Sequence, residues 1–226
     1  MRKIKPIEIL VFVMLFSLAA IAAAALAYVC VGFFARADFR GVAVTVAGIL
    51  LLYVFGIALY RLFLAIAPLP AGEVPLHSRN ESVYHIYLLF FLVLFYPVMR
   101  SGFLPVPLLR MFYLALGARL GSNTYTSGIL FDPIFVSIGD NSIVGQGALV
   151  IPHAIEGEHL SHEPVRIGNQ VTIGANAVVL QGCVIEDGAV VAIGAVVAKG
   201  THIGRNEVWG GIPAKRLSVR SDLVVQ

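Results

Sequence analysis

From Ile167 to Val208 the sequence reads IGNQVT, IGANAV, VLQGCV, IEDGAV, VAIGAV, VAKGTH and IGRNEV, seven consecutive six-residue units that each open with Ile or Val. Three earlier units, IGDNSI, VGQGAL and VIPHAI, begin at Ile138. In nine of these ten units the fifth place holds Ser, Ala, Val, Cys or Thr. Repeats of this length predict a parallel β-helix, in which three units make one triangular coil.

The positions within each unit have separate tasks in such a coil. The opening aliphatic side chain points into the prism, and the fifth position also faces inward near a corner, where only a small side chain fits. Gly and Asn between them suit bends that need a positive φ. LGSNTY, at Leu120, lies three units before Ile138 and fits the same phase. We therefore expect about four coils from Leu120 to Val208, stacked at the ~4.8 Å spacing of neighbouring strands.

This pattern resembles the repeat of the hexapeptide-repeat acyltransferases, including the maltose, xenobiotic and polysaccharide O-acetyltransferases. The resemblance covers about 118–217 and includes the ending VWGGIPAKRL. It implies a left-handed parallel β-helix, although the general crossover rule would favour right-handed turns. It also implies an acyl-coenzyme A-dependent O- or N-acyltransferase, with acetyl-coenzyme A the expected donor, and a homotrimer with active sites between neighbouring subunits. Residues 218–226 would form a C-terminal tail.

The first 117 residues have a different, strongly apolar character. The chain of 226 residues is 58% hydrophobic and has a mean hydropathy of +0.87. Residues 9–35 contain no Asp, Glu, Lys or Arg, and neither do residues 41–60. Both stretches reach the ~20 residues that a helix needs to cross a bilayer. We therefore expect an α-helical membrane region with spans at about 9–35 and 41–67, and membrane lipids as partners.

A third apolar stretch, at about 83–116, permits two interpretations. Pro97 interrupts it, and Gly102, Pro105 and Pro107 follow. A full third span would put the β-helix on the opposite side from the N-terminus, whereas a membrane-dipping hairpin would leave both on one side. We favour the hairpin, with its tyrosines (84, 87, 96 and 113) at the lipid headgroups. The basic residues at 2, 3 and 5 then predict a bacterial inner-membrane protein with a cytoplasmic catalytic domain.

Three of the six histidines gather at the single interruption of the repeat after Ile138, an eleven-residue excursion at 156–166. His153 holds the fourth place of VIPHAI and is expected to point outward at the mouth of the excursion. By the resemblance it is the general base, whose neutral imidazole takes a proton from an acceptor hydroxyl or amine. Glu156 is either the carboxylate that orients this ring or a solvated loop acid. His159 and His162 are candidate acceptor contacts.

The donor and acceptor sites are further implications of the resemblance. Along the coils the donor would meet backbone amides near Ala177, Gly194 and Ala195. In the ending, Trp209, Lys215 and Arg216 either contact the adenine or phosphates of coenzyme A or cap the open end of the prism. Asp132, in the Asp-Pro pair ahead of IGDNSI, is either an acceptor ligand or a turn-former.

Composition excludes other classes of function. The net charge of +3 and the absence of an interleaved basic and aromatic patch argue against nucleic acid. The two cysteines, Cys30 and Cys183, form no metal-binding spacing and no plausible disulfide, so no metal is expected. The favoured function is a membrane-bound acyltransferase for a glycan, glycolipid or other membrane-associated acceptor. The alternatives are a zinc enzyme resembling the γ-type carbonic anhydrases, which need three histidines around the metal, and a non-catalytic trimeric membrane scaffold.

Overall fold

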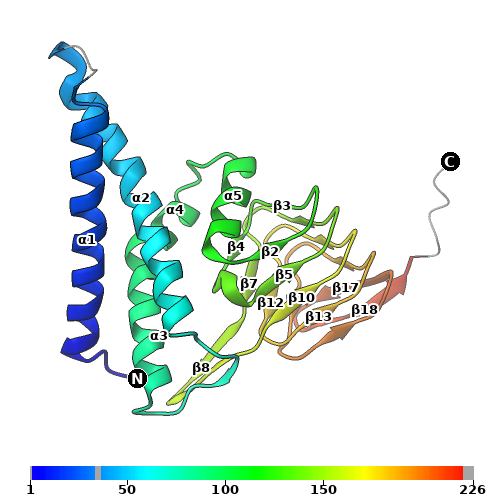
Figure 1. Ribbon diagram of the computed structural model, residues 1–226. Helices are drawn as coiled ribbons and strands as arrows, with labels where there is room; N and C mark the ends of the chain where they lie inside the picture. Colours follow the sequence, from blue (N-terminus) through cyan, green and yellow to red (C-terminus); the bar gives the residue numbers. More distant parts are fainter. Residues whose placement is uncertain (1, 34–36, 221–226) are drawn as a thin grey trace. The chain divides into compact units, whose positions relative to one another are not determined.

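The computed structural model describes residues 2–33 and 37–220 and contains two compact units (Figure 1). Met1–Leu69 and Leu76–Val98 make up a helical unit. Pro70–Pro75 and Met99–Gln226 make up a β-helical unit, of which the last six residues lie outside the described part. The chain thus leaves the helical unit for a few residues after its second long helix and returns before its third.

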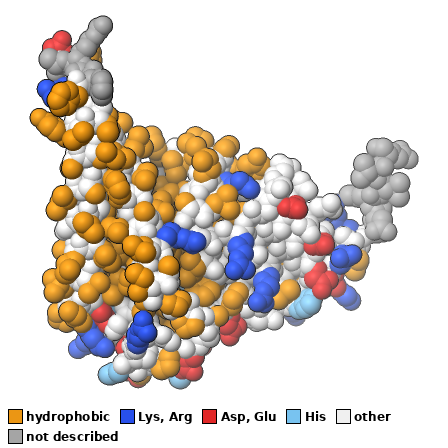
Figure 2. Space-filling view, in the orientation of Figure 1, with side chains coloured by type: hydrophobic (Ala, Val, Ile, Leu, Met, Phe, Trp, Pro, Cys, Tyr) orange, Lys and Arg blue, Asp and Glu red, His pale blue; other side chains and the backbone are white. Residues whose placement is uncertain are grey.

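Long apolar helices dominate the helical unit. They are α1 (Pro6–Cys30), α2 (Arg40–Ile66) after the short turn η1 (Ala37–Phe39), and a third stretch made of α3 (Arg79–Phe90), the π-helical segment η2 (Phe91–Phe95) and α4 (Tyr96–Arg100). Within the described residues, these three stretches are long and apolar enough to cross a membrane. Figure 2 shows hydrophobic side chains covering the visible face of α1 and α2.

The third stretch is one continuous helix, although Pro97 was expected to interrupt it. Proline has no N–H to donate, and its ring collides with the carbonyl four residues earlier in a regular α-helix. Here the π-helical turn comes directly before Pro97, and the Tyr96 N–H donates to the Phe91 carbonyl, five residues back. Because this turn is wider than an α-helical turn, the helix accommodates Pro97 and continues to Arg100.

Aromatic and charged contacts hold α3 against α1 and α2. The rings of Phe90 and Phe12 meet edge to face at 5.1 Å. At the start of both helices, Arg2 pairs with Glu81 at 3.3 Å and Glu8 with His85 at 2.7 Å. The N-terminal ends of α1 and α3 therefore lie side by side.

The second unit is a parallel β-helix with three flat faces. Its coils are formed by β2 (Arg119–Leu120), β3 (Tyr125–Thr126) and β4 (Ile129–Leu130); β5 (Val136–Ile138), β6 (Ile143–Val144) and β7 (Leu149–Ile151); β10 (Val165–Ile167), β11 (Thr172–Ile173) and β12 (Val178–Leu180); and β13 (Val184–Ile185), β14 (Val190–Val191) and β15 (Val196–Val197). Strands β16 (His202–Ile203) and β17 (Glu207–Gly211) begin a further coil. The faces have the orders β16-β13-β10-β5-β2, β17-β14-β11-β6-β3 and β15-β12-β7-β4. The expected four coils are confirmed.

Strand register confirms the repeat and the length of its interruption. Ser137 pairs with Arg119, eighteen positions earlier, and Ile167 pairs with Ile138, twenty-nine positions earlier, which is one coil plus the eleven inserted residues. The first coil deviates, because Ile129 pairs with Leu149 at a separation of twenty. The segment that connects β3 to β4 is two residues shorter than the segment that connects β6 to β7 in the next coil.

Side chains fill the prism as the repeat predicts. The opening aliphatics of one face stack inward, each at most 4% exposed: Ile138, Ile167, Ile185 and Ile203. Small fifth-position side chains line the corners and are also buried: Ser142, Ala148, Ala177, Cys183, Ala189 and Ala195. Cys183 is therefore a packing residue.

The excursion is an ordered antiparallel hairpin rather than a loop. It consists of β8 (His153–Glu156) and β9 (His159–His162), and β1 (Gly72–Glu73) pairs with β9 as a third strand. The coil stops when β7 ends at Ile151 and resumes at Val165. The excursion thus begins earlier than the expected residue 156, and His153 stands on its first strand instead of on a regular coil.

Helix α5 (Val106–Leu116) belongs to the β-helical unit, so the boundary lies near Met99 and not at the expected residue 117. It begins after Pro105, ends at Gly117 (φ 110°) and buries Leu109, Tyr113 and Leu116. The Tyr113 hydroxyl donates to the Gly128 carbonyl and accepts from the Leu130 N–H, each at 3.1 Å. Tyr113 therefore bridges two backbone groups inside the unit and is not a headgroup anchor. The expected membrane-dipping hairpin at 83–116 is not formed, because its two halves belong to different units.

The C-terminal end forms a second antiparallel hairpin. β17 pairs with β18 (Ala214–Val219), which extends one face of the prism. The expected tail at 218–226 therefore starts inside a strand, and 221–226 lie outside the described residues.

Candidate active site

Asp132 and His153 form the central pair of the site. Asp132 precedes the turn η3 (Pro133–Phe135) and has a left-handed backbone, with φ 42° and ψ 64°. Asp tolerates this conformation better than most residues, and Pro133 fixes the turn that follows. Its Oδ2 accepts a hydrogen bond from Nδ1 of His153, the first residue of β8. The carboxylate is nearly buried, with 6% of its side chain exposed, whereas the imidazole keeps 27% exposed.

This contact sets the tautomer of the ring. An ionised carboxylate only accepts hydrogen bonds, so Nδ1 carries a proton and Nε2 presents its lone pair. Burial lowers the pKa of His153, but the hydrogen bond and the charge of Asp132 outweigh it and hold the pKa above its usual value. The pair can therefore take up a proton at Nε2 and stabilise the resulting imidazolium.

Of the two roles considered for Glu156, the structure matches the exposed acid and not the carboxylate that orients His153. The exposed carboxylate of Glu156 pairs with Lys199, which lowers the pKa of Glu156. The carboxylate that orients the His153 ring is Asp132, for which we had expected only a role as acceptor ligand or turn-former. The strand register brings the two side chains together: Leu130 pairs with Val150, Asp132 lies two residues after the end of β4, and His153 lies two residues after the end of β7. The first coil still has eighteen residues, but β4 lies two residues earlier in it than the repeat predicts, so an eighteen-residue count misses this alignment.

His162 lies inside the hairpin, directly across the strands from His153. Its side chain is 0% exposed, and its ring stands 6.4 Å from the His153 ring and 5.0 Å from the Phe135 ring. Burial, the main cause, lowers the pKa of His162 to about 4, so it is neutral at physiological pH. Because the His162 ring is fully buried, it cannot make the contact with the acyl acceptor that was expected of it. His159 is exposed on the same strand and pairs with Glu73 at 3.2 Å.

The expected donor amides are engaged inside the coils. The N–H groups of Ala177 and Ala195 donate to the carbonyls of Gly174 and Ala192, both at 3.2 Å. The N–H of Gly194 donates to the Ala175 carbonyl at 2.9 Å. The amides of these three residues therefore do not point freely outward, as donor binding there would require.

The C-terminal hairpin brings the other expected donor residues together. Trp209 Nε1 donates to Glu207 at 2.8 Å, and Arg216 pairs with the same carboxylate at 3.0 Å. These two bonds and the Gly204 N–H lower the pKa of Glu207. Arg216 remains 62% exposed, and Lys215 is exposed beside it. The hairpin thus offers cations to an anion, with part of the Arg216 charge compensated by Glu207.

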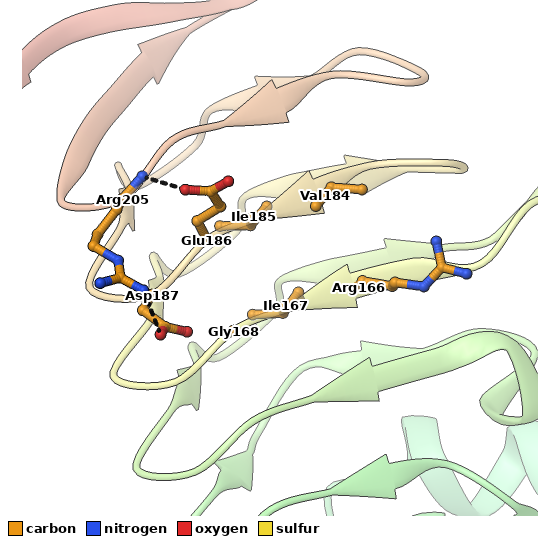
Figure 3. A pocket seen from close by; sticks show the side chains of 8 residues that line it. All are labelled: Arg166, Ile167, Gly168, Val184, Ile185, Glu186, Asp187 and Arg205. Carbon is orange, nitrogen blue, oxygen red and sulfur yellow. Dashed lines mark hydrogen bonds and ion pairs between the residues drawn. The ribbon is translucent and has the colours of Figure 1, made fainter.

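A shallow pocket lies on the outer surface near the start of the fifth coil (Figure 3). Its lining comes from β10, β13 and the turns beside them: Arg166, Ile167, Gly168, Val184, Ile185, Glu186, Asp187 and Arg205. Arg205 bonds Glu186 through its backbone N–H at 3.0 Å and Asp187 through its guanidinium at 3.4 Å. The pocket contains none of the expected site residues. In the described part of the chain, no three His, Cys, Asp or Glu side chains are grouped as metal ligands.

Comparison with known proteins identifies the repeat. The family described as bacterial transferase hexapeptide (six repeats) matches residues 164–199, so the chain contains repeats of this kind. No curated protein sequence matches the chain.

Solved structures with similar folds include a hexapeptide-repeat-containing acetyltransferase from Vibrio cholerae (25% identity, TM-score 0.44, 47% of this chain and 64% of that one). A galactoside acetyltransferase in complex with coenzyme A has 26% identity and a TM-score of 0.40, over 46% of this chain and 55% of that one. A serine acetyltransferase from Neisseria gonorrhoeae has 16% identity and a TM-score of 0.43, over 93% of this chain and 72% of that one. The chain thus spans less than two thirds of the length of the first two enzymes.

Proposed function

We propose that this chain is a membrane-bound acyltransferase that moves an acyl group, expected to be acetyl, from acyl-coenzyme A to a hydroxyl or amine of a membrane-associated acceptor. The observation that carries the proposal is the Asp132–His153 pair at the foot of a hairpin inserted into a hexapeptide-repeat β-helix. A non-catalytic scaffold would have no need for a buried carboxylate that orients a partly exposed imidazole.

The chemistry follows from the geometry of this pair. Nε2 of His153 takes the proton from the acceptor as its oxygen or nitrogen attacks the thioester carbonyl. Asp132 stabilises the imidazolium through the Nδ1 hydrogen bond. When the carbon–sulfur bond breaks, the same Nε2 returns the proton to the leaving sulfur, so the base is regenerated. Coenzyme A supplies the thioester, and the exposed cations Lys215 and Arg216 are suited to hold its phosphates.

The helical unit supports the membrane assignment. The windows of α1 and α2 that could cross a bilayer are only 17% and 6% buried, so their apolar side chains need another apolar environment. We infer that lipid supplies it, and that Arg2, Lys3 and Lys5 mark the cytoplasmic side. After two crossings, β1 returns to that side and pairs with β9, which favours a cytoplasmic β-helix with direct access to coenzyme A.

A homotrimer of left-handed coils belongs to the same proposal. The sixth positions of the units carry half-exposed aliphatics on the outer faces: Leu149, Val178, Val184, Val190 and Val196. Three of them, Leu149, Val178 and Val196, share the face of β7, β12 and β15, and contact between prisms through this face would remove these three side chains from water. Mass measurement in mild detergent tests this assembly.

The proposed activity is tested with purified protein, radiolabelled acetyl-coenzyme A and a lipid extract from the expressing cells. We expect label to move into the lipid fraction, with free coenzyme A released in equal amount, and transfer to persist after treatment with a zinc chelator. Loss of all turnover with the chelator, together with stoichiometric zinc in the untreated protein, would favour the carbonic-anhydrase-like alternative. If acetyl-coenzyme A remained unconsumed with every lipid fraction, the proposal would be contradicted.

A further inference from the structure

We propose that β1, the short strand in the connection between α2 and α3, is a positioning element of the catalytic hairpin and ties His153 to the membrane segment. This inference rests on the proposed function and deepens it, because it makes the membrane region part of the catalytic apparatus. It also narrows the acceptor to molecules that present their reacting group close to lipid headgroups.

Strand β1 is fully integrated into the hairpin. Gly72 pairs with His162 and Glu73 with Ser161, and the Val74 N–H donates to the Leu160 carbonyl at 2.9 Å. Val74 is 0% exposed, so the strand is fixed by packing as well as by hydrogen bonds.

The path from β1 to the base is short. β9 pairs on its other edge with β8, and His162 stands opposite both Gly72 and His153. His153 is therefore the second neighbour of β1 across one small sheet. Displacement of β1 would expose His162 and remove the support behind the strand that carries the catalytic ring.

A third strand matters here because a two-stranded hairpin is at best marginally stable in water. β8 and β9 leave the prism after Ile151 and have no place in its stacked coils. β1 turns this projection into a three-stranded sheet. A catalytic ring must be held to a fraction of an ångström, and a misplacement of about 1 Å can reduce turnover about 10²-fold.

Chain length bounds the distance of the hairpin from the membrane helices. Six residue steps separate Ile66, the end of α2, from Gly72, and six more separate Glu73 from Arg79, the start of α3. An extended chain covers about 3.3–3.6 Å per residue, so neither link exceeds about 20–22 Å. The hairpin is thus joined on both sides to the apolar helices by short links, which favours an acceptor held at the membrane.

The strand pairing can be tested without an activity assay. Because Val74 and Leu160 are hydrogen-bonded, Glu73 and Ser161 form the closer, non-hydrogen-bonded kind of pair, with Cα atoms about 4.5 Å apart. Such a pair accepts a disulfide. In a Cys30→Ser background of the full-length chain, we expect Glu73→Cys with Ser161→Cys to cross-link under mild oxidation. Glu73→Cys with Glu158→Cys, three positions before Ser161 in the chain, is the matched control and should not cross-link.

The effect on catalysis is tested with two variants at one position. Val74→Pro removes the N–H that bonds Leu160, whereas Val74→Ala keeps it and loses only side-chain volume. We expect Val74→Pro to lower kcat at least about tenfold with donor Kd unchanged, and to shift the pKa of the catalytic base in the pH profile downward as the His153–Asp132 contact loosens. Val74→Ala should lose less than about threefold and keep the profile.

The outcomes separate the two proposals. Absence of the Glu73–Ser161 cross-link in an active protein, or equal kinetics for the two Val74 variants, would overturn the positioning role of β1. Cross-linking in a chain whose unmodified form transfers no acyl group would overturn the proposed function while supporting the strand pairing.

Discussion

Asp132 combines two properties that make it the decisive side chain of the site, a left-handed backbone and a buried carboxylate aimed at Nδ1 of His153. Replacing it by Asn keeps the shape but removes the charge that raises the pKa of His153, while the burial that lowers this pKa remains. For Asp132→Asn we therefore expect the base to titrate at lower pH in a kcat/KM profile, and kcat to fall about 10²–10⁴-fold.

Glu156→Gln is the matched control for this change, since Glu156 is exposed and pairs with Lys199. It should leave the profile and the rate close to those of the unmodified chain. A shift with Glu156→Gln and none with Asp132→Asn would reverse the assignment of the orienting carboxylate.

His162 predicts a pH dependence of stability. Its pKa is about 4 in the folded chain, below the usual value of 6.5, so the unfolded chain binds the proton more tightly between these two pH values. Stability is therefore complete above pH 6.5 and falls as the pH drops from 6.5 to 4, by about 3 kcal/mol at most. His162→Gln should flatten this loss in denaturant titrations, whereas His159→Gln, at an exposed position, should keep it. Equal behaviour of both variants would contradict the buried, neutral state of His162.

The residues show where sequence reasoning succeeds and where it stops. His153 could be found because the repeat breaks beside it. The role of Asp132 could not be found, because β4 is displaced by two positions within the first coil, which conceals that Asp132 and His153 follow paired strands. The hydrogen bonds of the Ala177 and Ala195 N–H groups could not be predicted either, because a six-residue pattern locates side chains but does not show which N–H groups the coil already uses.

Helix α5 is the element that sequence reasoning placed in the wrong unit. Its apolar run suggested the membrane, but Tyr113 is buried against the β-helix and bridges Gly128 and Leu130. Burial raises the pKa of Tyr113 to about 12, in keeping with a hydroxyl that stays protonated. Hydropathy alone does not distinguish a helix that packs on protein from one that enters lipid.

Tyr113→Phe tests this packing. It leaves a buried carbonyl and a buried N–H without the hydroxyl, which should lower the free energy of unfolding by about 1–3 kcal/mol in denaturant titrations. Tyr125→Phe, at a position 38% exposed, should stay within about 0.5 kcal/mol. Equal losses for the two variants would remove Tyr113 from the internal contact.

At the scale of the whole molecule, the repeat predicted the β-helix and its four coils well because nearly every six-residue unit carries the same inward pattern. The pairing of β1 with the hairpin could not be predicted from the sequence, because a two-residue strand between apolar helices has no periodicity. In the proposed topology that strand nevertheless determines the sidedness, because β1 follows the two helices proposed to cross the membrane and pairs with β9.

Cysteine labelling in intact cells tests this sidedness. In a Cys30→Ser background, an impermeant reagent should reach Asp38→Cys, between α1 and α2, but should reach Lys3→Cys and Ser218→Cys only after permeabilisation. Labelling of Ser218→Cys without Lys3→Cys in intact cells would show that the third apolar helix crosses the membrane.

The most direct test of the account is single-turnover acyl transfer by His153→Ala, measured beside donor affinity in the same preparation. We expect the rate to fall about 10²–10⁴-fold while the Kd for acetyl-coenzyme A stays unchanged, because a general base acts on the acceptor proton and not on donor binding. A rate close to that of the unmodified chain, with the large loss appearing in His159→Ala instead, would contradict the assignment of His153 as the base.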